Sequence, residues 1–346
     1  MTGIICIMRL LVFEFITGGG FINQPLPQSL LQEGHLMRNA LLDDLCSITD
    51  LELLVLQDER LILIEQSPMT NLQYLIIAQE IDLHVFLSAR QTDYDAVWLI
   101  APETEGILVQ WCQFFSQQGK YLYTSSQQAV TICQDKLATS EKLQTAGIAC
   151  VPSHLYDLSL LEFATSWVIK ANDSVGCDQV YLIESEQDWK NVLPGLQAEK
   201  TYIIQPYITG QTLSLSCLFN QGKAYYICCN QQHTYIEQQQ FVLSACTVNI
   251  QDKNIQIYHA LCQQIADAIP QLFGYVGIDF IETEAGENLI LEINPRLTTS
   301  YAGIKAALGL NLAELVINLP NEPPELKKIR NQQVLVDIEQ GYAHAS

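Results

Sequence analysis

LILEINPRLTTSY, residues 289–301, carries the clearest fold signal in the chain. Its apolar run continues without a turn into Glu292, Asn294, Pro295 and Arg296. Two potential oxygen ligands, a proline and a guanidinium therefore stand at the end of what the alternation predicts to be a buried strand. Charged groups at such a position need partners or a bound ion, because burial of an unpaired charge is costly.

The neighbouring residues predict that this strand belongs to a β-hairpin. VGIDFIET (276–283) and NLILEINP (288–295) both have strand character. They flank EAGE (284–287), which is a turn signal. We expect a symmetric antiparallel hairpin whose centre lies between Ala285 and Gly286.

This register predicts a cluster of oxygen ligands on one face of the hairpin. Asp279 falls opposite Glu292, with their Cβ atoms roughly 5 Å apart. Asn294 follows on the same face, opposite Gly277, and the missing side chain there would leave room for phosphate groups. Facing carboxylates repel unless a cation lies between them, and oxygen ligands favour a hard cation such as Mg²⁺ (or Mn²⁺). Arg296 is then placed to contact a phosphate or a developing anion. Either acid taken alone would also suit an exposed face.

The composition limits the possible partners. The 346 residues are 49% hydrophobic and 16% charged, which is typical of a globular protein with two or three domains. A formal net charge of −21 argues against a nucleic acid or an anionic membrane as partner. The 11 cysteines include no C-x-x-C pair, so we expect reduced, mostly buried thiols in a cytoplasmic protein. Arg9 and Glu14 interrupt the apolar start, which favours a first buried strand over a secretory segment.

The order of strand-like and helical segments predicts the domains. Strands and helices alternate over residues 1–118, which indicates an α/β domain with a parallel sheet. The remainder has α+β character, and we expect lobes at 119–204 and 205–326 followed by a peripheral tail at 327–346. Residues 125–147 are expected to form one helix with Ser125 or Ser126 as N-cap.

These residues together resemble the ATP-grasp superfamily, whose ligases join a carboxylate to an amine through an acyl phosphate. In that family an Asp on one strand and a Glu-x-Asn on the next hold two magnesium ions, as Asp279, Glu292 and Asn294 would. The resemblance covers roughly residues 119–320. It implies an ATP-grasp fold preceded by a Rossmann-like (pre-ATP-grasp) domain.

The resemblance also implies an ATP site. Lys136 in QDKLAT and Lys170 in WVIKANDSVG match the lysines that reach the nucleotide phosphates, and Lys170 and Arg296 would be the catalytic cations. IIQPYITG (203–210) resembles the hinge that receives adenine, and the residues implied there are Gln205, Tyr207, Ile208 and Thr212. The sequence departs from the family in two places. The loop NDSVGCD contains only Gly176, and Gln211 or Thr212 replaces the usual ribose-binding acid.

The substrates are indicated by three further segments. FEFITGGGF, IAPETEGIL and NPRLTTSYAG are similar to a subgroup that implies glutamate as the activated acid and an aromatic amine such as tyramine or tyrosine as acceptor, in methanofuran-type cofactor biosynthesis. A different amino-acid or dipeptide ligation and a non-catalytic ATP sensor remain open, as does a homodimer. Residues 231–240 are expected to form a loop, in which His233 could contact a substrate, although a surface position is expected. The candidate substrate contacts are Gly18, Gly19, Gly20, Glu103, Ser300 and Tyr301. The glycines would equally suit a simple turn.

Overall fold

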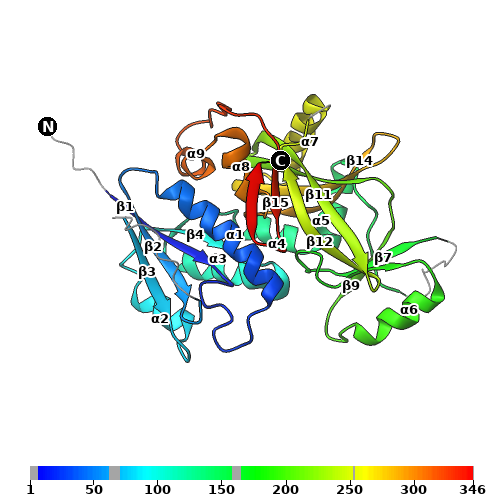
Figure 1. Cartoon of the computed structure of the whole chain (residues 1–346), viewed down its shortest axis with the longest axis horizontal. Coiled ribbons are helices and arrows are strands. Elements are labelled where there is room, and N and C mark those ends of the chain that lie inside the picture. The colour runs from blue at the N-terminus through cyan, green and yellow to red at the C-terminus, as the bar shows by residue number, and fades with distance from the viewer. Residues whose placement is uncertain (1–6, 62–70, 158–164, 252–253, 346) are drawn as a thin grey trace.

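A computed structural model describes residues 7–61, 71–157, 165–251 and 254–345, which are organised around two β-sheets (Figure 1). The smaller sheet belongs to the N-terminal domain and the larger sheet runs through the rest of the chain. No disulfide joins the cysteines in these ranges. Within the same ranges, no helix combines the length and apolarity needed to cross a membrane.

The N-terminal domain is the α/β layer structure that the alternation predicted. Its five strands are parallel, in the order β3-β2-β1-β4-β5. β1 is central and apolar on both faces, because α1 covers one face while α2 and α3 cover the other. The elements are β1 (Met8–Glu14), α1 (Gln28–Leu45), β2 (Leu51–Asp58), β3 (Leu72–Ile77), α2 (Leu83–Ala89), β4 (Ala96–Ile100), a 3₁₀ turn η1 (Thr104–Gly106), α3 (Ile107–Gln117) and β5 (Tyr121–Leu122).

The larger sheet has eleven strands and is mainly antiparallel, which confirms the α+β prediction. Its C-terminal lobe has the order β14-β13-β10-β11-β12, and its central lobe has the order β8-β7-β9-β6. The central lobe comprises β6 (His154–Leu155), β7 (Trp167–Ala171), β8 (Val180–Ile183), α6 (Glu186–Val192), η3 (Leu193–Gly195) and β9 (Tyr202–Pro206). The C-terminal lobe comprises β10 (Gln211–Asn220), β11 (Lys223–Glu237), β12 (Gln240–Val248), α7 (Ile255–Ala268), β13 (Gly274–Glu282), β14 (Asn288–Asn294), α8 (Tyr301–Leu308) and α9 (Leu312–Asn318).

The prediction of a single helix over residues 125–147 is wrong. The structure has two helices, α4 (Gln127–Gln134) and α5 (Lys136–Thr145), separated at Asp135. The break occurs because the backbone of Asp135 is extended instead of helical. Its carboxylate accepts a hydrogen bond from the amide of Ala138 at 2.8 Å, so Asp135 is the N-cap of α5. Ser126 caps α4 as one of the two candidates predicted. The break places Lys136 at the start of α5.

Two segments are more ordered than the sequence suggested. Residues 231–240, expected as a loop, belong to the β11–β12 hairpin. The expected peripheral tail contains β15 (Val334–Asp337) and β16 (Tyr342–Ala345), and β15 pairs with β12. Val334 and Val336 are fully buried, so this segment extends the large sheet instead of lying loosely on its surface.

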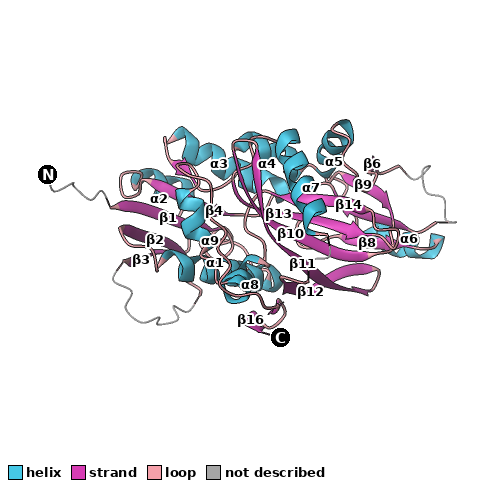
Figure 2. Ribbon diagram, turned by 90° about the horizontal axis from the view of Figure 1, so that it is seen from above, coloured by secondary structure: helices cyan, strands magenta, loops and turns pink. Residues whose placement is uncertain are grey.

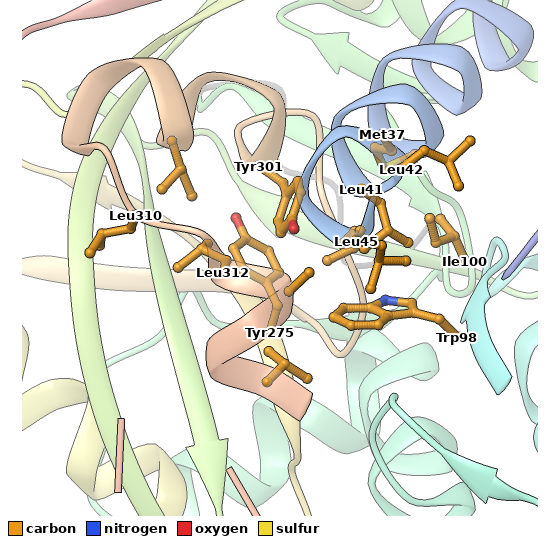
Figure 3. Packing of buried hydrophobic residues seen from close by; sticks show 14 of the residues in the cluster. Met37, Leu41, Leu42, Leu45, Trp98, Ile100, Tyr275, Tyr301, Leu310 and Leu312 are labelled. Carbon is orange, nitrogen blue, oxygen red and sulfur yellow. The ribbon is translucent and has the colours of Figure 1, made fainter. Parts of the chain in front are cut away.

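The N-terminal domain and the C-terminal lobe share one hydrophobic core. Helices α1 and α8 lie side by side (Figure 2). Leu41 and Leu45 of α1 pack between Trp98 of β4 and Tyr301 of α8 (Figure 3). The central lobe has a smaller cluster of its own, formed by Ile169, Ala171, Ile183, Trp189, Val192, Tyr202 and Ile204.

Candidate functional site

The hairpin places the acids as predicted, although its turn differs. Asp279 pairs with Glu292, and Gly277 pairs with Asn294. Nearer the turn, however, Glu282 pairs with Asn288, a register one residue away from the symmetric hairpin that the sequence suggested. A β-bulge in β14 between these two stretches absorbs the extra residue and brings the acids opposite each other.

The space over Gly277 is filled, so the prediction that it holds phosphates is wrong. A Cβ at this glycine would lie 2.6 Å from Cγ2 of Thr298. Thr298 follows β14 in sequence, and its hydroxyl lies 2.9 Å from that of Ser300. The glycine is therefore needed to let the segment after β14 pack back onto β13.

The pKa values of the two acids are shifted in opposite directions. Burial, together with the nearby Glu292 carboxylate, raises the pKa of Asp279 to about 8. Burial also opposes ionisation of Glu292, but the ammonium groups of Lys136 and Lys170 outweigh it and lower the pKa of that carboxyl. Lys136 Nζ lies 3.5 Å from Glu292 Oε2. Asn294 Nδ2 donates to Asp279 Oδ2 at 3.2 Å.

The donor set of Asp279, Glu292 and Asn294 suits a hard cation. Carboxylate and amide oxygens are ligands that Mg²⁺ prefers. In the part of the chain that is described, no group of three or more His, Cys, Asp or Glu side chains forms a metal cluster. An ion held by these three residues would therefore need additional oxygens from outside the protein. Mg²⁺ commonly obtains such oxygens from phosphates and water.

Both predicted phosphate-binding lysines are buried near these acids. Lys136, which as a lone helical lysine could have been a surface residue, is 7% exposed. Its ammonium donates to the carbonyl of Ser174 in the loop 172–178. Lys170 lies on β7, and burial lowers its pKa to about 8 against the attraction of Glu292. Two buried cations with so few anionic partners favour a site for additional negative charge.

A cavity of about 510 Å³ brings most of the predicted site together. This volume is in the range of small-molecule sites. Gln205 is held by a hydrogen bond from its Nε2 to Ser153 Oγ at 2.7 Å, which leaves its carbonyl oxygen as the acceptor for an amine. The predicted residues that line the cavity are Lys170, Gln205, Tyr207, Ile208, Thr212, Asp279, Glu292, Asn294, Arg296 and Ser300.

Several residues that line the cavity were not among the predicted contacts, and His233 and Glu33 are two of them. His233 was expected at the surface, but it lies on β11 facing the cavity, and its Nε2 is 2.7 Å from Thr247 Oγ1. Glu33 comes from α1, so the N-terminal domain also contributes a side chain to the cavity wall. Sequence gave no signal for Glu33, because one acid in an amphipathic helix is usually solvated.

Glu103 holds the guanidinium of Arg296 through two hydrogen bonds. Its Oε2 accepts hydrogen bonds from Nε at 2.9 Å and from a terminal nitrogen at 2.8 Å. The other terminal nitrogen donates to the carbonyl of Leu297. Burial disfavours the Arg296 charge, but Glu103 outweighs burial and raises the arginine pKa. Glu103 is thus a positioning residue, and the structure does not place it on the cavity wall as a substrate contact.

The remaining substrate candidates lie away from the cavity. A Cβ on Gly18 or Gly20 would come within 2.5 Å of a backbone oxygen, and one on Gly19 would collide with Ile77. These glycines are required by a tight turn, so their prediction as ligand contacts is not supported. Tyr301 is buried in the shared core, where its hydroxyl donates to Asp44 Oδ2 at 2.7 Å.

Comparison with known proteins defines the class. Residues 133–300 match the model of the ATP-grasp domain, and residues 51–130 match that of the pre-ATP-grasp domain. The two lobes, the hairpin and the preceding parallel sheet agree with this match. The chain belongs to the ATP-grasp superfamily and is an ATP-dependent, ADP-forming ligase that makes C–N bonds.

Its curated relatives include two tyramine–L-glutamate ligases. The chain is 26% identical to that of Methanocaldococcus fervens over 330 residues, which are 95% of this chain and 99% of the relative. It is 26% identical to that of Methanocaldococcus jannaschii over 343 residues, or 97% of both proteins. Among solved structures, the L-amino acid ligase from Bacillus licheniformis shares the fold, with a TM-score of 0.67 at 11% identity over 95% of this chain and 79% of that one.

Proposed function

We propose that this ligase joins glutamate to tyramine or a similar aromatic amine, with release of ADP and phosphate. One observation carries the proposal: the buried Lys170, two facing acids and Arg296 line one cavity, and the buried Lys136 pairs with one of those acids, Glu292. The activity named for its relatives, which match it over nearly their full length, supports these substrates.

ATP would occupy the cavity between the two lobes of the large sheet. Adenine would lie against the hinge, with Gln205 toward its amino group and Tyr207 and Ile208 beside it. Thr212 also lines the cavity and would lie near the ribose, where a neutral hydroxyl would replace the acid common in the family. Lys136 and Lys170 would reach the phosphates, and this would relieve the unfavourable burial of Lys170.

Magnesium fits the same arrangement, and enzymes of this superfamily use ATP with Mg²⁺. Asp279, Glu292 and Asn294 would hold it at the end of the hairpin. When bound, the ion would neutralise phosphate charge and keep the β- and γ-phosphates in a reactive geometry. The acids themselves gain from this arrangement, because a cation beside them would favour ionisation of Asp279 next to Glu292.

The chemistry requires an activated acid. A carboxylate reacts poorly with an amine, so the γ-phosphoryl group of ATP would first be transferred to the glutamate side chain or α-carboxylate to form an acyl phosphate. The residues contribute mainly position and charge to this transfer. Arg296 would stabilise the oxyanion that forms when the amine attacks, and Glu103 holds its guanidinium in place for that task.

The test replaces the amine by hydroxylamine. Protein incubated with ATP, Mg²⁺ and glutamate should give glutamyl hydroxamate and ADP in equal amounts. Formation of AMP and pyrophosphate would instead indicate an adenylate, and would contradict the acyl phosphate.

A panel of other acids and amines separates the alternatives. ADP release that is strongest with another amino acid would reassign the substrate while keeping the site. The altered loop 172–178 and the neutral residue near the ribose are the features that favour an ATP sensor. Tight ATP binding without ADP release for any acid would support that function.

A further inference from the structure

Glu33 connects the N-terminal domain to the reacting end of the cavity. It lines both the main cavity and a smaller recess of about 40 Å³. The recess is mostly apolar, with walls that include Ile16, Leu30, Met37 and Ile100 from the N-terminal domain. Arg296 lies on the wall of both spaces, so the recess opens where an activated acyl group would be held.

The Glu33 side chain is partly buried, and its carboxylate has no hydrogen-bond donor among the described residues. The loop 172–178 covers it, since a Cβ on Gly176 would lie 3.3 Å from Glu33 Oε1. Burial raises the pKa of Glu33 to about 7, against the attraction of Arg296. The other ionisable groups around it are Glu14, which also lines the recess, and the Cys177 thiol. A partly buried carboxylate with a raised pKa in the wall of a cavity often marks a functional site.

Arg296 does not account for Glu33. Nε and one terminal nitrogen of Arg296 already donate to Glu103, and the other terminal nitrogen donates to Leu297. Its geometry is therefore fixed without Glu33. What Glu33 can add is an anionic oxygen beside a position where an ammonium group would arrive.

We propose that Glu33 binds the ammonium group of the acceptor amine and takes its proton, while the apolar body of the acceptor packs against the mouth of the adjoining recess. This assignment rests on the proposed function. It names the acceptor side of the site, to which the family match assigns no residue in this chain. It also explains why an acid from α1 is directed into a cavity formed otherwise by the large sheet.

The proton balance is complete with the groups present. The acceptor arrives as R–NH₃⁺, and transfer of one proton to the Glu33 carboxylate gives neutral R–NH₂. The nitrogen lone pair then forms the C–N bond as the bond from carbonyl carbon to phosphate oxygen breaks. The second nitrogen proton leaves with the phosphate, and Glu33 later returns its proton to solvent. A group with a pKa near neutrality can perform both steps.

The experiment compares two acceptors in the Glu33→Gln variant. Tyramine is an ammonium ion near neutral pH and needs both binding and deprotonation, whereas hydroxylamine is largely neutral and needs neither. We expect kcat/KM for tyramine to fall by about 10²- to 10⁴-fold, the usual contribution of a general base. Formation of glutamyl hydroxamate should stay at the wild-type rate. Glu33→Asp, which keeps the carboxylate, should recover part of the tyramine activity.

Asp43→Asn is the matched control, because this acid lies on the same helix but is exposed and paired with Lys305. It should leave both reactions unchanged. Unaltered tyramine turnover in Glu33→Gln would overturn the proposal. An equal fall with both acceptors would also overturn it, because Glu33 would then act on acid activation or through Arg296. If the wild-type protein makes no product with either acceptor, the proposed function itself fails, and the role of Glu33 fails with it.

Discussion

At Lys170 the ligand-free protein holds a charge that it would be more stable without. The side chain is 5% exposed, and burial lowers its pKa from 10.5 to about 8. Between these two values the unfolded chain binds more protons than the folded one, so stability rises with pH through this range. Below pH 8 the full penalty is present. A lysine at this buried position, despite the penalty, fits a function in binding phosphate.

Replacing Lys170 by Met should therefore stabilise the protein while removing its activity. The shift corresponds to a gain on the order of 3 kcal/mol at pH 7. Denaturant unfolding at pH 7 and pH 10 would measure it, and the gain should shrink at the higher pH. Lys190→Met is the control, because this lysine of α6 is exposed. Its free energy of unfolding should change little. An equal gain at both pH values would contradict the assigned burial penalty.

Asp279 provides a second prediction at this scale. Asp279→Asn replaces a carboxylate that we propose as a metal ligand, and it removes the buried ionisable group whose pKa burial and Glu292 raise. We expect Mg²⁺-dependent turnover to fall by about two orders of magnitude or more. The unfolding temperature of the metal-free protein should be unchanged or higher. Glu284→Gln in the turn of the same hairpin is the control, and near-normal turnover in Asp279→Asn would refute the metal assignment.

At the scale of elements, local patterns predicted the strands better than their irregularities. Alternation located both strands of the β13–β14 hairpin, and the predicted pairing of Asp279 with Glu292 is confirmed. The predicted register near the turn was wrong by one residue, and the bulge in β14 offsets this difference at the acids. The bulge and the break at Asp135 depend on side-chain caps and packing partners from elsewhere in the chain, which periodicity cannot reveal. The burial of Lys136 and the approach of Glu33 depend on such distant contacts as well.

Gly277 tests the packing between β13 and the segment after β14. Gly277→Ala should destabilise the protein by about 1–3 kcal/mol, because its Cβ would collide with Thr298 Cγ2. Thr298→Ser removes that methyl group and keeps the hydroxyl. In a double-mutant cycle followed by thermal unfolding, the double variant should recover part of the loss, with a coupling of about 0.5 kcal/mol or more. Purely additive effects would show that another contact makes this glycine necessary.

On the scale of the whole molecule, the lobes differ in how they are attached. The N-terminal domain and the C-terminal lobe are joined by a common core in which α1 packs on α8. The central lobe has its own small core, and its β8 meets β12 at Tyr181 and Gln240, beside a hydrogen bond from Leu182 N to Gln239 O. Sequence located the segments but not this difference. Apolar periodicity shows that a helix face is buried without showing which lobe buries it.

The common core limits how the acceptor specificity of this ligase could be altered by recombination with a relative. Glu33 and most of the recess belong to the N-terminal domain, which makes that domain an obvious unit to transplant. The opposite face of α1, however, is matched to Tyr301 and the helices that follow it. A chimera joined near residue 118 would place one parent's α1 on the other parent's α8 and α9. A working graft would have to exchange these helices too, although they lie almost 200 residues further along the chain.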